Sequence, residues 1–384
     1  MKKVISTEKI PIKPWLEDIE EKALQQAKNL ANLPFAFKHI VILPDCHQGY
    51  GMPIGAVLAA KNTVVPNCVG VDIGCGVCAV QTNLKSIETE TLKQILGQIR
   101  KAIPLGFKHH KIKQEWRGFD RAPNLPIIQQ ELNSARYQLG SLGGGNHFIE
   151  IQKGSDGFIW IMLHSGSRNL GFKIAQEYHR QALNYCQQYN LNLPDKELAC
   201  LPMNNPQAQE YLAAMNFALD FAKANRALML EKIKQIIQKI IPQTTFGQTI
   251  DIHHNYAAEE VHFGKKVMVH RKGATSAKKG QLGIIPGSQG SKSYIVKGKG
   301  KPDSFLSCSH GAGRKMGRKQ AIRELNLKKE IKRLEDQSII HTLRHQSDLE
   351  EAVSAYKDIS KVMEDQKDLV EIITELSPLA VIKG

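Results

Sequence analysis

One pattern recurs along this chain and constrains its fold more than any other: a short apolar run ends in a glycine-containing loop that carries His, Asp, Asn or Cys. Apolar runs of this length, bounded by glycine, are typical of buried strands. Because loops at strand ends can meet at one rim of a sheet and often carry catalytic groups, we expect the loops to converge. The pattern occurs six times, at residues 45–47, 72–75, 145–147, 164–166, 253–255 and 309–311.

The side chains in these loops indicate a metal site. Each histidine taken singly is more often a structural hydrogen-bonding group than a ligand. Six such loops in one chain are hard to explain by packing, and together they indicate a site with more than one ion. Imidazoles with a carboxylate and few thiols suit a catalytic divalent metal. A bridging thiolate or carboxylate can join two ions, and paired ions suit phosphate chemistry.

The run VGVDIGCGVCAV (69–80) contains the only CxxC pair, Cys75 and Cys78. A structural zinc site would need a second pair of Cys or His ligands, which the sequence lacks. A redox CxxC would sit at a helix N-terminus, whereas this run is glycine-rich and strand-like. Both readings are therefore weak.

The rest of the chain predicts an α+β fold with mixed β-sheets flanked by helices. Residues 17–31 and 89–103 have helical periodicity, and residues 171–245 read as a helical insertion between sheet elements. The final LAVIKG reads as a strand. We find no linker-like boundary and predict a single domain over residues 1–384.

The bulk composition favours a soluble, cytoplasmic protein with a polyanionic partner. The apolar runs fall short of the roughly 20 residues that a membrane helix needs, and the charged start of the chain does not resemble a signal peptide. Seven cysteines, an odd number, argue against a disulfide framework. The formal net charge of +15 favours nucleic acid.

Several glycine loops carry cations suited to phosphate. PGSQGSKS (286–293) contains Lys292, and its order of residues excludes a Walker A loop. HRKGAT and SHGAGRKMGR place Arg271, Lys272, Arg314 and Arg318 beside glycines. Backbone N–H groups in such loops can cradle oxyanions, and arginine can bind phosphate with two hydrogen bonds.

The ordered set of motifs resembles the RtcB-type RNA ligases, the GTP-dependent tRNA-splicing and RNA-repair ligases, over nearly the whole chain. The resemblance rests on PDxHxGxG (44–51), GVDIGCG (70–76), GGGNHFIE (143–150), HSGSRNLG (164–171), HHNYA (253–257), HRKGA (270–274), PGSxGSKS (286–293), CSHGAGR (308–314), AYKDI (355–359) and the terminal VIKG. It implies an RtcB-like fold in one catalytic domain.

The resemblance also implies two Mn²⁺ ions as cofactors. One would be held by Cys75, His164 and His254. The other would be held by Asp72, Cys75 and His147, with the Cys75 thiolate as the bridge. Asp72 and Cys75 are three residues apart on a glycine-loosened turn, so both can reach one centre. Cys78 is then interpreted as a small buried apolar side chain.

For GTP, the resemblance implies covalent catalysis. His310 would attack the α-phosphorus and become guanylylated, with Asp45 supporting the reaction. The expected nucleotide-binding residues are Asn146, Phe148, Glu150, Ser288, Lys292, His310, Gly311, Gly313, Arg314, Tyr356 and Lys383. Within this set, Phe148, Glu150, Tyr356 and Lys383 would form the guanine pocket.

The implied reaction joins RNA 3′-phosphate or 2′,3′-cyclic phosphate ends to 5′-hydroxyl ends through an RNA-ppG intermediate. The expected partners are broken RNA, such as tRNA halves, and an archease-type activating protein; the chain is expected to be a monomer. The basic loop 104–130, which contains Trp116, is open to two readings: an RNA-tracking segment or a solvated loop.

Two alternatives stay open at this point. Asp45-x-His47 and Gly145-Asn146-His147 match pieces of the metal-dependent phosphoesterases, although the GDxxD and GHxH pieces of that class are not found. A non-enzymatic RNA-binding protein would explain the positive charge but not the Asp, Cys and His set.

Overall fold

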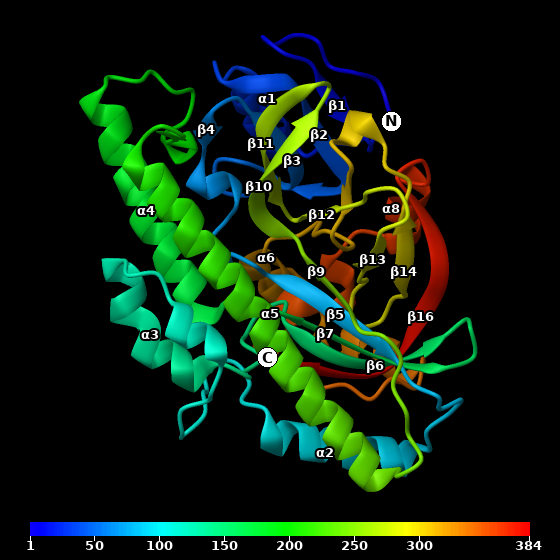
Figure 1. Ribbon diagram of the computed structural model, residues 1–384. Helices are drawn as coiled ribbons and strands as arrows, with labels where there is room; N and C mark the ends of the chain where they lie inside the picture. Colours follow the sequence, from blue (N-terminus) through cyan, green and yellow to red (C-terminus); the bar gives the residue numbers. More distant parts are fainter.

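The computed structural model describes residues 1–384, and its strands form two large sheets (Figure 1). The five-stranded sheet is mixed, because its first pair is parallel and the other pairs are antiparallel. Its order is β1 (Ile12–Pro14), β2 (Ala36–His47), β3 (Ile54–Ala60), β11 (Lys265–Lys272) and β10 (Asn255–His262).

The seven-stranded sheet is antiparallel throughout. Its order is β13 (Leu282–Ile285), β14 (Ser293–Gly298), β16 (Val370–Lys383), β6 (Phe148–Gly154), β7 (Ile159–Ser165), β5 (Gly76–Gln81) and β9 (Ile250–His253). Two short pairs complete the strands: β12 (Ala274–Ser276) with β15 (Ser307–Ser309), and β4 (Thr63–Val64) with β8 (Leu201–Pro202).

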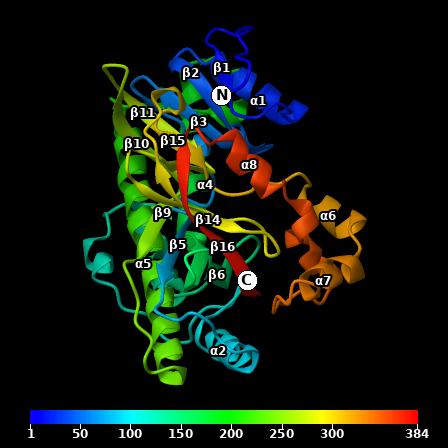
Figure 2. The same cartoon turned by 90° about the vertical axis from the view of Figure 1, so that its right-hand side faces the viewer.

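Eight α-helices surround the sheets: α1 (Glu21–Ala31), α2 (Thr89–Ala102), α3 (Pro126–Gln138), α4 (Arg168–Gln188), α5 (Pro206–Ile240), α6 (Arg318–Glu324), α7 (Leu327–Glu335) and α8 (Ile359–Asp365). In Figure 1 α5 crosses the front of the molecule diagonally; in Figure 2 it lies along one side, with α6 and α7 on the opposite side. None of the helices is both long and apolar enough to cross a membrane.

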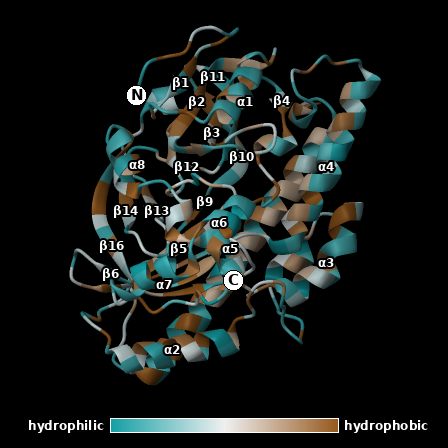
Figure 3. Ribbon diagram, turned by 180° about the vertical axis from the view of Figure 1, so that it is seen from behind, coloured by the Kyte–Doolittle hydropathy of each residue, from teal (hydrophilic) through white to brown (hydrophobic).

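The helices form where the apolar spacing and the end residues favour them. In α2 the buried side chains Leu92, Ile95, Leu96 and Ile99 follow a spacing of three or four residues, so one face is apolar and the other is polar (Figure 3). The long α5 begins at Pro206 after Asn205, whose side chain accepts the backbone N–H of Gln207 at 2.8 Å.

The α+β class is confirmed, and the five-stranded sheet is mixed as expected, whereas the other sheets are antiparallel. Helices α4 and α5 lie in the segment predicted to be a helical insertion. The first helix begins at Glu21 rather than at residue 17, because Glu20 has a non-helical ψ of 133°. The assignment of one domain to residues 1–384 stays a prediction.

Two apolar cores flank α5. Its first half packs with α1, α4 and the five-stranded sheet, and contributes Tyr211, Phe217 and Phe221. Its second half contributes Met229 and Ile233 to a core with α2 and the seven-stranded sheet. The helix is thereby fixed against both sheets, and the residues between the two cores face the candidate site.

Candidate active site and metal centre

The predicted convergence of strand ends is visible in the register of the seven-stranded sheet. Gly76, the first residue of β5, is paired with Ser165 at the end of β7 and with His253 at the end of β9. Phe148, the first residue of β6, is paired with His164 and with Lys383 at the end of β16. Antiparallel neighbours start and end at the same edge. The ends of β5, β6, β7, β9 and β16 named above therefore lie at one rim of the sheet, together with the loop residues next to them.

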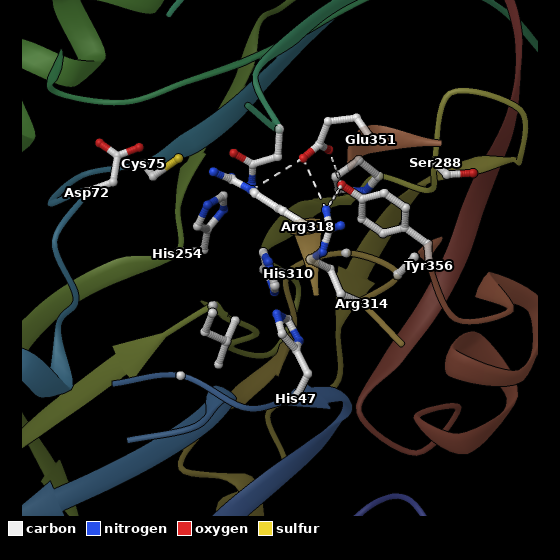
Figure 4. Close-up of a pocket in the computed structure, with 18 of the residues that line it drawn as sticks. His47, Asp72, Cys75, His254, Ser288, His310, Arg314, Arg318, Glu351 and Tyr356 are labelled. Carbon is white, nitrogen blue, oxygen red and sulfur yellow. Dashed lines mark hydrogen bonds and ion pairs between the residues drawn. The ribbon is translucent and has the colours of Figure 1, made fainter. Parts of the chain in front are cut away.

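Five side chains at this rim form a donor cluster, in which Cys75 and the three histidines are buried and Asp72 is partly exposed. The Cys75 sulfur lies 3.1 Å from Nε2 of His164 and 3.4 Å from Nε2 of His147. His164 Nε2 lies 3.3 Å from His254 Nε2, and His147 Nε2 lies 3.1 Å from a carboxylate oxygen of Asp72. All five predicted metal ligands thus lie together, and Figure 4 shows Asp72, Cys75 and His254 in one part of the cavity.

The chemistry of this donor cluster fits a divalent cation. His164 Nδ1 donates to the Asn146 carbonyl oxygen at 3.2 Å, so the lone pair of its Nε2 faces the cluster. Burial lowers the pKa of His164 and of His254 well below 6.5, so both rings are neutral. Two neutral imidazoles whose Nε2 atoms approach each other beside a sulfur and a carboxylate are arranged to share a metal. Three members, Cys75, His147 and His164, have all their ligand atoms within 4.8 Å of one another.

The state of the Cys75 thiol points in the same direction. Burial, together with the negative charge of Asp72, holds the pKa of this thiol well above 9.0. The protein groups alone therefore keep the sulfur protonated, and a bound cation is what would convert it to a thiolate ligand. Cys78 is equally buried but belongs to the apolar core beneath the sheet.

His310 is held by a buried carboxylate. Asp45, near the end of β2, is fully buried, and one of its oxygens accepts the His310 backbone N–H at 2.9 Å and Nδ1–H at 2.6 Å. Burial opposes ionisation of Asp45, but the His310 imidazole and the hydrogen bonds outweigh it and lower the pKa of this carboxyl. Because Nδ1 is engaged, Nε2 is the nitrogen left free for chemistry. The His310 ring centre lies 4.8 Å from that of His254.

A cavity of about 790 Å³ opens beside His310, a size suited to a nucleotide. Of the predicted nucleotide-binding residues, the following line it: Asn146, Phe148, Glu150, Ser288, His310, Gly311, Gly313, Arg314, Tyr356 and Lys383. Lys292 does not line the cavity; its side chain is half exposed and pairs with Glu375 at 2.5 Å.

Glu351 organises one wall of the cavity and was not identified from the sequence. Its carboxylate lies 3.1 Å from Arg314, 3.7 Å from Arg318 and 3.5 Å from Lys383, and it accepts the hydroxyl of Tyr356 (Figure 4). Arg314 therefore faces the cavity with its guanidinium already bonded to protein. No motif marks Glu351, because three of its four partners, Arg314, Arg318 and Lys383, lie more than 30 residues away along the chain.

Asn225 and Arg226 on α5 were also missed. The buried Arg226 donates to the carbonyl oxygens of Gly74 and Ser165, both at 3.0 Å, to Asp251 at 2.6 Å, and contacts His253 at 3.2 Å. Each of these four residues lies within three positions of a cluster donor. The Asn225 amide similarly bonds the backbone of Ser141 and Gly166. Both residues fall among the buried positions of α5, but no sequence motif marks them.

Arg271, which the sequence placed among the phosphate-binding cations, is corrected. It is not a phosphate ligand, because it is fully buried and bonds the Glu260 carboxylate at 2.5 and 3.1 Å.

For the basic loop 104–130 the sequence left an RNA-tracking segment and a solvated loop open. In the structure the Trp116 ring packs within the protein against Phe217 and Phe221, with ring centres 5.7 and 6.0 Å apart.

The donor cluster lies beside the His310 imidazole, which has a free nitrogen. Sites of this kind are found in enzymes that transfer phosphoryl or nucleotidyl groups. A family model described as tRNA-splicing ligase RtcB matches residues 26–123 and 117–384. The chain belongs to the RtcB family.

Relatives with this name match over nearly their full length. RNA-splicing ligase RtcB of Escherichia coli (strain K12) is 38% identical, with 99% of each chain covered. tRNA-splicing ligase RtcB of Methanococcus maripaludis is 32% identical over 96% of this chain and 92% of the relative. The protein of that name from Thermococcus kodakarensis is 31% identical over 95% and 92%.

Proposed function

We propose that this protein is an RNA ligase that joins RNA 3′-phosphate or 2′,3′-cyclic phosphate ends to 5′-hydroxyl ends, with GTP and two Mn²⁺ ions, in tRNA splicing or RNA repair. The observation that carries the proposal is the arrangement of His310. Its Nδ1 is held by Asp45 at 2.6 Å, and its ring stands beside the donor cluster at the wall of a nucleotide-sized cavity. Membership of the RtcB family supports it.

In the first step, Nε2 of His310 attacks the α-phosphorus of GTP. The bond from that phosphorus to the bridging oxygen breaks, and pyrophosphate leaves with the electron pair. Asp45 accepts the Nδ1–H throughout, so its carboxylate stabilises the positive charge that develops on the ring. The product is a His310–GMP adduct.

The cavity orients the nucleotide for this attack. Phe148 and Tyr356 supply aromatic surface for guanine, while Glu150 and Lys383 supply polar contacts to its edge. On the phosphate side, the cavity is lined by Asn146, Ser288, Gly311, Gly313 and Arg314. Gly313 has a φ of +74°, and a Cβ there would collide with the Asp45 carbonyl oxygen, so the loop needs glycine at this position.

Two transfers complete the reaction. A 2′,3′-cyclic end is first hydrolysed to a 3′-phosphate. An oxygen of that phosphate then attacks the adduct phosphorus, the bond to His310 Nε2 breaks, and RNA-ppG forms. The 5′-hydroxyl of the second RNA attacks the RNA-side phosphorus, GMP leaves, and a 3′,5′-phosphodiester is made.

Of the donor cluster, Cys75, His164 and His254 would hold one Mn²⁺, and Asp72, Cys75 and His147 would hold the other. Bound manganese supplies Lewis-acid stabilisation of the charge on the phosphoryl oxygens. The distances of 3.1 to 3.4 Å between neighbouring donor atoms support the pairing of these residues around shared sites.

The expected partners follow from the same proposal. Broken RNA, including tRNA halves, is the substrate, and the net charge of +15 supplies the attraction to its backbone. We further propose an archease-type activating protein, a monomeric state and a cytoplasmic location.

The phosphoesterase alternative is less well supported. In that class Asp and His of the DxH motif both bind metal, whereas here Asp45 accepts two hydrogen bonds from His310 on one oxygen and is not a member of the donor cluster. His47 lines the cavity, but its Nδ1 contacts the Asp45 carbonyl oxygen at 2.9 Å. Hydrolysis of simple phosphodiesters without GTP would favour this alternative.

Incubation with α-labelled GTP and Mn²⁺ tests the proposal. We expect a covalent protein–GMP adduct that is absent in His310→Ala and that is consumed when RNA with a 3′-phosphate is added. His341→Ala, which changes a histidine outside the cavity, serves as the control. An adduct that persists in His310→Ala would contradict the assignment of the nucleophile.

A further inference from the structure

Two large apolar side chains are exposed at the mouth of the cavity. Tyr50 is 72% exposed and Val71 is 42% exposed, and both line the cavity. Val71 directly precedes Asp72 of the donor cluster. Neither residue has a role in the steps proposed above, and neither was singled out from the sequence.

The Tyr50 ring is exposed although its loop is firmly held. The Gln48 N–H donates to Glu20 at 3.2 Å. Gln26 accepts the Gly49 N–H at 3.1 Å and donates to the Gly49 carbonyl oxygen at 2.7 Å. Gly51, with a φ of +66°, packs against Glu197. The backbone that carries the exposed ring is thus held in place by hydrogen bonds on the side of the ring that precedes it in the sequence.

One buried lysine, Lys272, links the backbone of the Tyr50 loop to the segment that precedes Val71. The Lys272 ammonium donates to the carbonyl oxygen of Tyr50 at 2.6 Å and to that of Asn67 at 3.0 Å. Its alkyl chain lies beneath Gly70, where an added Cβ would be 3.5 Å from Cε. The Tyr50 loop and the segment that leads to Asp72 are therefore joined by a single side chain, and both Tyr50 and Val71 line the cavity that also contains Asp72 and Cys75.

We propose that Tyr50 and Val71 form a stacking platform for the terminal nucleobase of an RNA end. This inference rests on the proposed function and names how the RNA, rather than GTP, is held. A flat ring on a rigid loop accepts any base, because every base has a π-face. The exposed cations Lys315, Arg318 and Lys319 line the same cavity and would neutralise the strand's phosphates. With the base on this platform, the adjoining end of the strand lies beside Asp72.

The kinetic test uses Tyr50→Ala, Tyr50→Phe and the control Tyr189→Ala. Tyr189 is another exposed tyrosine, at the end of α4 and outside the cavity. We expect Tyr50→Ala to raise the KM for RNA about 10-fold, consistent with the loss of one base–aromatic contact, while kcat and the yield of GMP adduct without RNA stay unchanged. Tyr50→Phe and Tyr189→Ala should behave as wild type. An unchanged KM in Tyr50→Ala, or an equal loss in Tyr50→Phe, would overturn the platform.

A binding measurement keeps this test separate from the proposed reaction. Short RNAs carrying 2-aminopurine at the terminal position are titrated into the protein without GTP, one with a 3′-phosphate end and one with a 5′-hydroxyl end. Stacking predicts quenching that Tyr50→Ala removes, and the quenched probe identifies which end the platform takes. If neither probe is quenched, the inference fails even where the GMP adduct forms. If instead the protein forms no adduct but the quenching still depends on Tyr50, the proposed ligase reaction would be contradicted and the stacking platform supported.

Discussion

The carboxylate of Asp45 and the imidazole of His310 are joined twice, through the backbone N–H at 2.9 Å and through Nδ1 at 2.6 Å. The two residues are 265 positions apart in the sequence. One buried acid therefore fixes both the position of the histidine and the nitrogen that it presents to the cavity.

Asp45→Asn should lower the rate of GMP adduct formation by about 10²-fold or more, in line with the loss seen when a histidine loses its orienting carboxylate. The amide oxygen can still accept both hydrogen bonds from His310, but the negative charge that stabilises the imidazolium is gone. Single-turnover labelling with GTP measures the rate. A thermal melt close to that of wild type would show that the loss is chemical, whereas an unchanged rate would remove Asp45 from the mechanism.

The two thiols of VGVDIGCGVCAV should respond differently to the same change. Cys75→Ala should abolish adduct formation and reduce the amount of bound Mn²⁺, because this sulfur contacts two of the cluster histidines. Cys78→Ala should cost about 1 kcal/mol of stability, as expected for a small buried side chain, and leave the chemistry intact. Metal analysis and GTP labelling of the two variants test these different roles. Equal loss of activity in two folded variants would show that the assignment of metal binding to Cys75 alone is wrong.

Arg226→Lys should weaken Mn²⁺ binding about 10-fold and lower the melting temperature. A lysine cannot reach the carbonyl oxygens of Gly74 and Ser165 and the Asp251 carboxylate together, and each unsatisfied buried acceptor costs about 1–3 kcal/mol. Isothermal titration with Mn²⁺ reads the effect without any turnover. The control is Arg180→Lys, an exposed arginine on α4. Unaltered metal affinity in a destabilised Arg226→Lys would limit this residue to a role in stability.

Glu150 should make the protein less stable as the pH rises. Burial raises the pKa of this carboxyl from 4.5 to about 8, against the opposing charge of Lys383. Between these values the unfolded chain binds fewer protons than the folded one, so the free energy of unfolding falls as pH increases, by an amount on the order of a few kcal/mol. Glu150→Gln should remove this dependence. Urea unfolding of both proteins from pH 5 to 9 tests it, and parallel profiles would contradict the assignment.

Of the two lysines predicted for the nucleotide site, only Lys383 should contribute to GTP binding. Lys383 lines the cavity with its ammonium 5.5 Å from the Phe148 ring centre, whereas Lys292 pairs with Glu375 outside it. Lys383→Ala should weaken GTP binding about 10-fold, and Lys292→Ala should leave it unchanged. Fluorescence titration with a labelled GTP analogue measures both affinities; comparable losses would show that Lys292 reaches the nucleotide after all.

The parts of this molecule that follow from local pattern were accessible from the sequence. Apolar runs ended by glycine predicted the strand-and-loop units. Helical spacing located α2 to within a few residues and predicted helix over residues 171–245, where α5 and most of α4 lie. The meeting of strand ends at one rim follows from antiparallel pairing. The full set of Asp72, Cys75, His147, His164 and His254 depended on the family resemblance, since spacing alone does not say which loops face one another.

What the sequence concealed depends on partners that become neighbours only in the folded chain. Arg271 looks like a phosphate ligand until Glu260 is seen beside it on the neighbouring strand. Glu351 and Arg226 carry no local signature, because each is defined by the groups that surround it. The outward position of Lys292 likewise depends on a partner, Glu375, that lies on another strand.

The span of α5 has a consequence for how the molecule unfolds. Its first half belongs to one apolar core and its second half to another, with Asn225 and Arg226 between them. If one core unfolds, α5 loses packing contacts, and the other core depends on the same helix. The two cores should therefore unfold together in one cooperative event. Amide hydrogens around residues 225–226 should accordingly exchange only at the slow rate set by global unfolding, and the metal donors that these residues hold would be preorganised by the whole chain.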